Sequence, residues 1–216
     1  MTSTLTTLQA SGWTIIDGVK SDEDFYRIST SIGVPLPSPT GELIKRITPQ
    51  TSEQSRPGTM SDQYGLEAFP FHTDTAFWPT PARYVLLKAE GDIRRNTCLL
   101  SIPDLISKAG IPEKVKSSIW KIRTPQHAFY CSMSFKQSGV GGYRYDPVCM
   151  MPANRPACFV RSVVDNLIAN SKAQTIQWSP GDVVVLDNWR MLHSRGPAPQ
   201  NEATRTLARI YVEGNK

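Results

Sequence analysis

Short apolar runs, many of them alternating with polar residues, recur along the chain and predict many short β-strands. The pattern is clearest in the C-terminal part, where four such runs are separated by turn-forming residues such as Ser179-Pro180-Gly181-Asp182 and Asn188-Trp189. A Gly-rich turn at residues 138–142 separates two further runs. The predicted strands are residues 12–19, 43–47, 84–87, 98–102, 124–132, 143–148, 175–178, 183–186, 191–194 and 206–212.

Helical spacing of apolar residues occurs in four segments. Ser21 offers an N-cap and residues 22–24 place acids in a first turn, so a helix follows the first strand. Two helices are predicted at residues 102–108 and 112–120, and the longest candidate covers residues 157–173. The apolar stripe of that longest helix is expected to be Phe159, Val163, Leu167 and Ile168.

Two polar or proline-containing segments interrupt these elements. Residues 33–41 contain prolines and glycines and are expected to break the first helix. Residues 48–63 are polar, contain Pro57 and Gly58, and are predicted to form a mobile loop ahead of residues 69–78. Many short strands with a few helices outside them indicate an α+β protein built round a β-barrel or jelly roll.

Composition places the chain among globular proteins of one domain. It has 216 residues, of which 39% are hydrophobic and 20% charged, which excludes a disordered or collagen-like chain. No apolar run reaches the roughly 18 to 20 residues of a membrane span. Residues 1–10 have neither a basic flank nor an apolar core, so a cytoplasmic location is expected.

Cysteines and charge narrow the chemistry further. The four cysteines follow no zinc-finger or redox spacing, and we expect reduced, mostly buried thiols. The net charge is +5, but the basic residues are scattered and form no cluster that predicts a nucleic-acid surface. The positive excess is equally suited to small anionic ligands.

The three histidines are the best candidates for chemistry. His72 and Asp74 are two residues apart, so on an extended backbone both side chains point to one face and can meet at one ion. His193, at the end of a predicted strand, offers a second imidazole. Two imidazoles and one carboxylate form the facial triad that suits non-haem Fe(II). For His72 alone, a structural histidine at the surface or in a hydrogen-bonded core is the alternative, and His127 is expected to be structural or substrate-facing.

Four separated motifs, in order, carry a family resemblance: residues 72–81 (HTDTAFWPTP), Asn96-Thr97, residues 187–195 (DNWRMLHSR) and residues 205–209 (RTLAR). They resemble the TauD/TfdA family of Fe(II)- and 2-oxoglutarate-dependent dioxygenases. The resemblance covers about residues 66–212 and implies a double-stranded β-helix, a cupin-like jelly roll with flanking helices, as one domain over residues 1–216. It implies Fe(II) held by His72, Asp74 and His193, with 2-oxoglutarate and O2 as cosubstrates.

The same resemblance assigns a cosubstrate site. Arg205 matches the arginine that binds the distal carboxylate of 2-oxoglutarate, and Thr97 matches a threonine that hydrogen-bonds the same group. An arginine also suits this site on physical grounds alone. A buried dianion needs its distal charge neutralised, and a planar guanidinium does so with two parallel hydrogen bonds. A solvated strand arginine is the alternative for Arg205.

Substrate contacts are expected from four further residues. Arg209 lies four residues after Arg205, on the same face of a regular strand, and in the family this position often meets substrate or cosubstrate. The other candidates are Arg195, Arg144 and Trp78, with core packing or ion pairing as the alternative. The carboxylate of Asp74 favours oxygen chemistry, because a small residue replaces it in family members that halogenate.

The sequence therefore predicts an enzyme that oxidises a small molecule. The resemblance implies conversion of 2-oxoglutarate to succinate and CO2 with hydroxylation of an amino acid, carboxylate, sulfonate or natural-product intermediate; desaturation and ring closure would need the same residues. Nucleic acids and membranes are not expected partners. A nucleic-acid- or protein-modifying oxygenase and a non-catalytic jelly-roll binding module are the alternatives.

Overall fold

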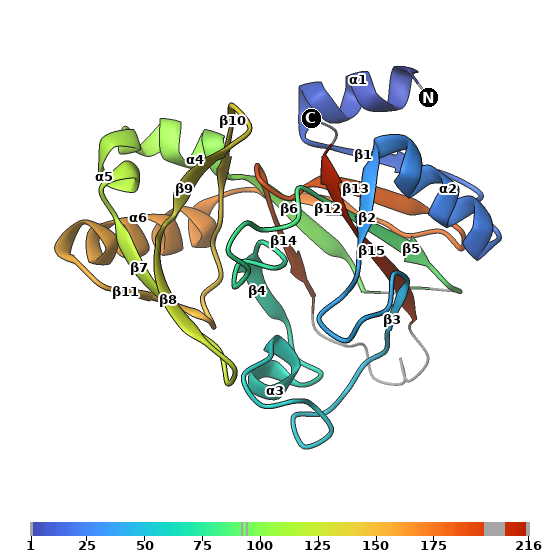
Figure 1. The fold of residues 1–216 in the computed structure, drawn as a ribbon, viewed down its shortest axis with the longest axis horizontal. Helices are drawn as coiled ribbons and strands as arrows, with labels where there is room; N and C mark the ends of the chain where they lie inside the picture. The colour runs from blue at the N-terminus through green and yellow to red at the C-terminus, as the bar shows by residue number, and fades with distance from the viewer. Residues whose placement is uncertain (1, 92, 94, 197–205, 215–216) are drawn as a thin grey trace.

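The computed structural model describes residues 2–91, 93, 95–196 and 206–214, and two antiparallel sheets form its centre (Figure 1). The six-stranded sheet has the order β1 (Trp13–Ile16), β13 (Val183–Asp187), β5 (Tyr84–Ala89), β15 (Leu207–Gly214), β2 (Gly33–Leu36), with β3 (Lys45–Ile47) also paired to β15. The four-stranded sheet has the order β12 (Gln174–Ile176), β6 (Thr97–Ser101), β14 (Met191–Arg195), β4 (Phe69–His72).

The core lies between these two sheets. Leu87 and Leu186 of the large sheet pack in one buried cluster with Leu99 and Met191 of the small sheet. The alternate residues of the central strands, such as Val185, are also buried, because helices cover the outer face of the large sheet. Burial on both faces explains why these strands are almost continuously apolar in sequence.

Helices cover both outer faces of the pair of sheets. α1 (Thr2–Ser11) and α2 (Asp22–Ile32) pack on the large sheet. Leu192, on the outer face of the small sheet, joins a second cluster that contains residues of α4 (Ile102–Ala109), α5 (Pro112–Lys116) and α6 (Arg155–Asn170). Together the elements form the α+β jelly roll with flanking helices that the sequence predicts.

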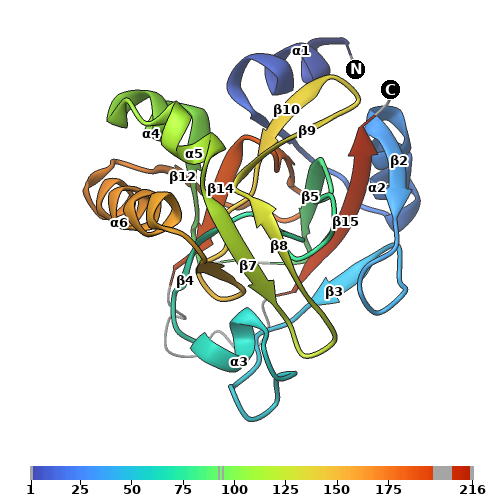
Figure 2. The same cartoon turned by 60° about the vertical axis from the view of Figure 1, so that its left-hand side comes forward.

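Three smaller elements complete the fold. A three-stranded sheet has the order β11 (Met150–Pro152), β7 (Ile119–Arg123), β8 (Ala128–Ser132), and a separate hairpin joins β9 (Ser134–Gln137) to β10 (Val140–Tyr143) (Figure 2). The short helix α3 (Met60–Tyr64) precedes β4. Among the described residues no helix is both long and apolar enough to cross a membrane.

Several element predictions need correction. Strand β2 lies within residues 33–41, and its single proline, Pro35, is tolerated because β2 is an edge strand. The helix predicted at 112–120 ends at Lys116, and β7 follows. The loop predicted at 48–63 contains the start of α3, capped by Thr59. Helix α1 has no counterpart among the predicted elements.

The region predicted as strands 124–132 and 143–148 is also arranged differently. Its Gly-rich turn joins β9 to β10 through Ser138 and Gly139, which have φ values of 47° and 83°. Two positive φ angles form the turn type that matches the twist of a two-residue hairpin. The turn therefore pairs residues 134–137 with 140–143, and only β8 survives from the first predicted strand.

The longest helix buries a slightly different face from the predicted one. Ala157, Val160 and Val164 are the fully buried residues of α6. Phe159 is 48% exposed, so its placement on the buried stripe is wrong. The other three stripe residues, Val163, Leu167 and Ile168, pack partly buried against the core.

Candidate metal centre

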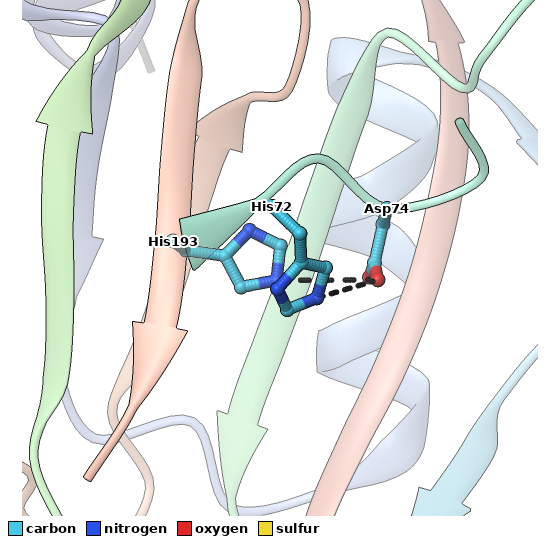
Figure 3. A group of neighbouring side chains, drawn as sticks. All are labelled: His72, Asp74 and His193. Atoms are coloured by element: carbon cyan, nitrogen blue, oxygen red, sulfur yellow. Dashed lines mark ion pairs between the residues drawn. The ribbon is translucent and has the colours of Figure 1, made fainter. Parts of the chain in front are cut away.

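The pairing of β4 with β14 brings two imidazoles together. His72 and His193 are direct partners in the antiparallel register. Residues directly opposite each other in such a pair project to the same face of the sheet. The two rings lie with their centroids 4.3 Å apart, side by side in Figure 3.

Asp74 completes the group from the turn that follows β4. Its Oδ1 lies 3.6 Å from His72 Nε2 and 3.9 Å from His193 Nε2. All three donor atoms lie within 4.8 Å of one another, and each residue is 8% exposed. Two atoms each about 2.1 Å from one ion are at most about 4.2 Å apart, so both distances to the carboxylate fit a shared metal.

Hydrogen bonding fixes which nitrogen of His72 faces the carboxylate. His72 Nδ1 lies 2.9 Å from the carbonyl oxygen of Pro70, which can only accept, so Nδ1 carries the proton. In the neutral imidazole, Nε2 then presents its lone pair toward Asp74 and His193. Metal-ligating histidines are oriented in this way by a carbonyl behind the ring. A nitrogen- and oxygen-rich triad with open remaining positions suits non-haem Fe(II).

Electrostatics favour the metal-binding forms of Asp74 and His193. Burial alone would raise the pKa of Asp74, but Arg209 at 3.1 Å and the two imidazoles hold the pKa of this carboxyl well below its usual range. Burial and the neighbouring His72 lower the pKa of His193 to about 3. Burial would also lower the pKa of His72, but the carboxylate of Asp74 outweighs this effect, and the pKa of His72 is raised. An ionised carboxylate and a neutral His193 are the forms that bind metal.

The triad opens into a cavity of about 100 Å³ that three other predicted residues line: Thr97, Arg195 and Arg209. Thr97 Oγ1 accepts a hydrogen bond from Trp178 Nε1 at 3.1 Å, which leaves its own hydroxyl proton to donate to a ligand. Arg195 donates to the carbonyls of Gly65 and Glu67 and lies 3.5 Å over the ring of Phe69. It therefore ties the end of β14 to the chain just before β4.

Two predicted substrate residues lie away from this cavity. Arg144 is buried and donates to the backbone carbonyls of Ala76, Trp78 and Pro79, so it holds the segment after Asp74. This position gives no support to a substrate contact by Arg144. The ring of Trp78 packs edge-on against Tyr211 and lines a separate cavity of about 300 Å³.

The remaining two predictions have different outcomes. Arg205 lies outside the described residues, so its role stays a prediction from sequence. His127 donates from Nε2 to the carbonyl of Phe77 at 3.0 Å, a contact that anchors the loop between β7 and β8. This contact corresponds to the structural alternative for His127.

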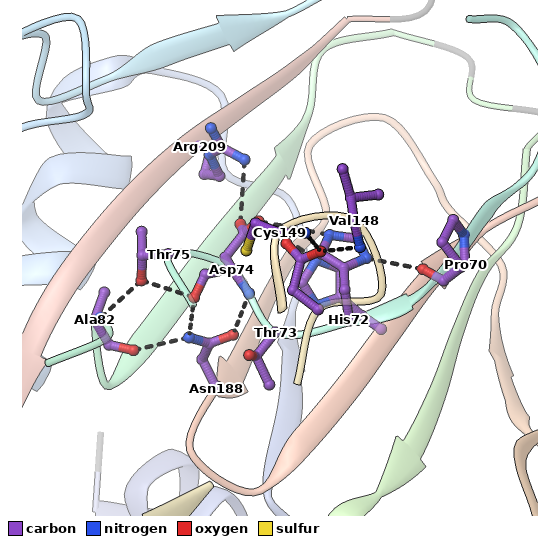
Figure 4. A network of polar contacts seen from close by, with 12 residues as sticks. Pro70, His72, Thr73, Asp74, Thr75, Ala82, Val148, Cys149, Asn188 and Arg209 are labelled. Carbon is purple, nitrogen blue, oxygen red and sulfur yellow. Dashed lines mark hydrogen bonds and ion pairs between the residues drawn. The ribbon is translucent and has the colours of Figure 1, made fainter. Parts of the chain in front are cut away.

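Sequence reasoning missed the residue that holds Asp74. Asn188, predicted only as part of a turn, hydrogen-bonds both backbone groups of Asp74 (Figure 4). A signal existed in the sequence, since Asn188 stands in the same short motif as His193. An amide in a turn, however, more often serves the turn itself.

Comparison with known proteins gives a consistent result. The sequence profile of the family described as taurine catabolism dioxygenase TauD, TfdA family matches residues 160–211. The resemblance to the TauD/TfdA family is confirmed. The matched segment contains His193, Arg205 and Arg209 but not the motif of His72 and Asp74.

Solved structures of TauD-like oxygenases share the fold. An asparagine oxygenase matches with a TM-score of 0.74 at 16% identity, covering 97% of this chain and 77% of that one. The non-haem iron oxygenase OrfP matches with a TM-score of 0.75 at 17% identity over 99% and 80%. A taurine dioxygenase from Burkholderia xenovorans matches with 0.74 at 15% identity over 99% and 81%. The double-stranded β-helix fold is thereby confirmed.

A curated relative matches over a shorter segment. The 3-((Z)-2-isocyanoethenyl)-1H-indole synthase of Fischerella ambigua (strain UTEX 1903) is 31% identical over 68 residues. The match covers 32% of this chain, and it spans only 24% of the relative's length.

Proposed function

We propose that this protein is a non-haem Fe(II)- and 2-oxoglutarate-dependent dioxygenase that oxidises a small molecule, with hydroxylation as the expected outcome. The observation that carries the proposal is the convergence of His72, Asp74 and His193, buried at the wall of one cavity. Fe(II), 2-oxoglutarate and O2 are the proposed cofactor and cosubstrates. The whole chain, residues 1–216, is proposed to act as one such domain.

The charge balance of the cavity supports an anionic cosubstrate. Asp74 and Arg209 form an ion pair that is neutral by itself, so a divalent cation would leave two positive charges. Arg195 adds a further positive charge to the lining. A buried excess of positive charge is costly unless an anion offsets it, and the dianion 2-oxoglutarate would neutralise two of these three charges.

The proposed ligands of the metal and of the cosubstrate then have defined parts. His72, Asp74 and His193 hold the metal and leave its other positions open for ligands. When bound, Fe(II) supplies the activation of O2 that couples decarboxylation of 2-oxoglutarate to oxidation of a C–H bond. Thr97 and Arg205 are proposed to bind the distal carboxylate of 2-oxoglutarate, while apolar wall residues exclude water from the site.

Amino-acid-like substrates are the first choice for testing. The asparagine oxygenase structure contains 2S,3S-3-hydroxyasparagine with succinate, and an OrfP structure contains (3S)-hydroxy-L-Arg with succinate. Arg209 and Arg195 could each pair with a carboxylate of a substrate of this kind. Carboxylates, sulfonates and natural-product intermediates follow in the same screen.

We also propose that the protein is located in the cytoplasm. All four cysteines are free thiols, which fits the reducing cytoplasm, although only Cys149 is buried, so the prediction of mostly buried thiols is wrong. Two other functions remain distinguishable by experiment: salt-sensitive nucleic-acid binding would favour a nucleic-acid-modifying oxygenase, and failure to bind iron would favour a non-catalytic binding module.

A turnover screen tests the proposed activity. The protein is incubated in air with Fe(II), ascorbate and 2-oxoglutarate, and succinate is measured with each candidate amino acid, sulfonate or carboxylate. We expect succinate formation that depends on iron and increases with a true substrate. The absence of succinate in every mixture, including mixtures without substrate run to long times, would contradict the proposal.

The loop over residues 48–63 is predicted to close over the site when iron, 2-oxoglutarate and substrate are bound. Its first two residues, Thr48 and Pro49, already line the metal cavity. A glutamyl endopeptidase should therefore cut after exposed Glu53 more slowly in the loaded protein. Cleavage after Glu113, which is exposed on α5, serves as the control. Equal cleavage after Glu53 in both states would rule out closure.

A further inference from the structure

The turn that carries Asp74 is held by one buried amide. Asn188 is fully buried, and its Oδ1 accepts a hydrogen bond from the backbone N–H of Asp74 at 2.8 Å. Its Nδ2 donates to the carbonyl of Asp74 at 2.9 Å and to the carbonyl of Ala82 at 2.9 Å (Figure 4). These three bonds use the acceptor and both donors of the amide, a combination that no apolar or acidic side chain of this size provides.

The backbone next to Asp74 is strained, which shows that the turn is fixed from outside. Thr75 has φ 55°, in the left-handed region that a β-branched residue rarely occupies. Its hydroxyl donates to the carbonyl of Asp74 and accepts from the N–H of Ala82 at 2.8 Å. Such a conformation persists only where surrounding contacts over-determine it, and it is found mostly at functional sites.

Asn188 also connects the two parts of the chain that carry the metal-binding side chains. It lies in the turn between β13 and β14, and β14 carries His193. Its own N–H donates to the carbonyl of Arg83 at 2.7 Å, which fixes the turn against the segment before β5. The side chain therefore sets where Asp74 stands relative to an imidazole that reaches the site on another strand.

We propose that Asn188 is a positioning residue, which fixes the carboxylate of Asp74 in the geometry needed for the metal. This inference rests on the proposed function, because it takes the triad to be an iron site. Partners that orient a metal ligand typically change metal affinity or activity by about 10- to 100-fold when they are removed. We expect Asn188→Ala to weaken Fe(II) binding by a factor in this range.

Metal titration of the whole protein is the test. Fe(II) is titrated under anaerobic conditions, Co(II) is titrated with its visible absorption as a second probe, and thermal unfolding is recorded with and without metal. Asn154→Ala is the matched control, since Asn154 also makes three hydrogen bonds, to Ala157 N, Ile119 N and Ser117 O, at the start of α6. We expect Asn154→Ala to lower stability without metal but to keep wild-type metal affinity.

A second variant keeps the test decisive if Asn188→Ala does not fold. Thr75→Val preserves the shape of the side chain and removes the hydroxyl that bridges Asp74 and Ala82. It should weaken metal binding in the same direction. Wild-type affinity in Thr75→Val and in every folded Asn188 variant would overturn the positioning role.

The outcomes also separate this inference from the proposed function. If the wild-type protein binds Fe(II), and Thr75→Val and every folded Asn188 variant bind it equally well, only the positioning role fails. If the wild-type protein binds metal but never converts 2-oxoglutarate, the proposed activity fails and the affinity comparison still decides the role of Asn188. If the wild-type protein binds no metal, both are overturned.

Discussion

His193→Ala is expected to abolish Fe(II) binding and, with it, all conversion of 2-oxoglutarate. The imidazole is one of three proposed protein ligands, and its Nε2 lies 3.9 Å from Asp74 Oδ1. Among the described residues, His72 is the only other histidine in this buried site. Water cannot restore the lost geometry of a facial triad. Anaerobic Fe(II) titration and succinate formation measure the two losses separately.

His127→Ala is the matched control for this variant. It removes the third histidine of the chain, which contacts Phe77 O rather than the triad. Circular dichroism should be native for both variants, and only His193→Ala should lose iron. If His193→Ala retained activity, the triad would be wrong and His127 would become the next candidate. Loss of iron is likewise expected for His72→Ala and Asp74→Ala.

The sequence predicted the sheet framework well because strand signals are local. Strands β5, β13, β14 and β15 were recognisable from apolar runs bounded by turn residues. The prediction that Ser21 caps the helix α2 is confirmed. Elements that depend on their partners were not recognisable. Strand β2 lies in a segment with several prolines and glycines, and it pairs with β15 at the edge of the sheet.

The three residues of the candidate site could be named from the sequence, but their arrangement could not. His72 and Asp74 are neighbours in the chain, whereas the approach of His193 depends on the register of β4 against β14. Register is set by long-range packing rather than by any local pattern. For the same reason the role of Asn188 is visible only after its amide is seen beside Asp74.

Arginines were the hardest residues to place, because a guanidinium serves equally well in a site and in a scaffold. Arg144 was predicted to meet substrate, but it satisfies backbone carbonyls in the segment after Asp74. Arg209 was predicted to meet substrate, and it lies in the cavity, paired with Asp74. Sequence spacing alone does not separate these two cases.

Arg205 carries the second large expected effect, and it separates cosubstrate binding from metal binding. If Arg205 binds the distal carboxylate of 2-oxoglutarate, Arg205→Ala leaves a buried anion unpaired, at a cost of about 2 to 5 kcal/mol. That corresponds to an affinity for 2-oxoglutarate about thirtyfold to several thousandfold weaker. Fe(II) affinity should change little, because no proposed metal ligand is altered.

Two variants control this prediction. Arg205→Lys should recover only part of the loss, since an ammonium keeps the charge but not the planar fork. Arg209→Ala removes the guanidinium that lies 3.1 Å from Asp74 and should affect the prime substrate more than 2-oxoglutarate. All three variants are compared by titration with 2-oxoglutarate in the presence of Fe(II) under anaerobic conditions. Binding is monitored by the metal-to-ligand charge-transfer absorption that the family resemblance leads us to expect. If Arg205→Ala binds 2-oxoglutarate as well as the wild type and Arg209→Ala does not, the carboxylate contact belongs to Arg209. If neither change matters, 2-oxoglutarate is not the cosubstrate of this site.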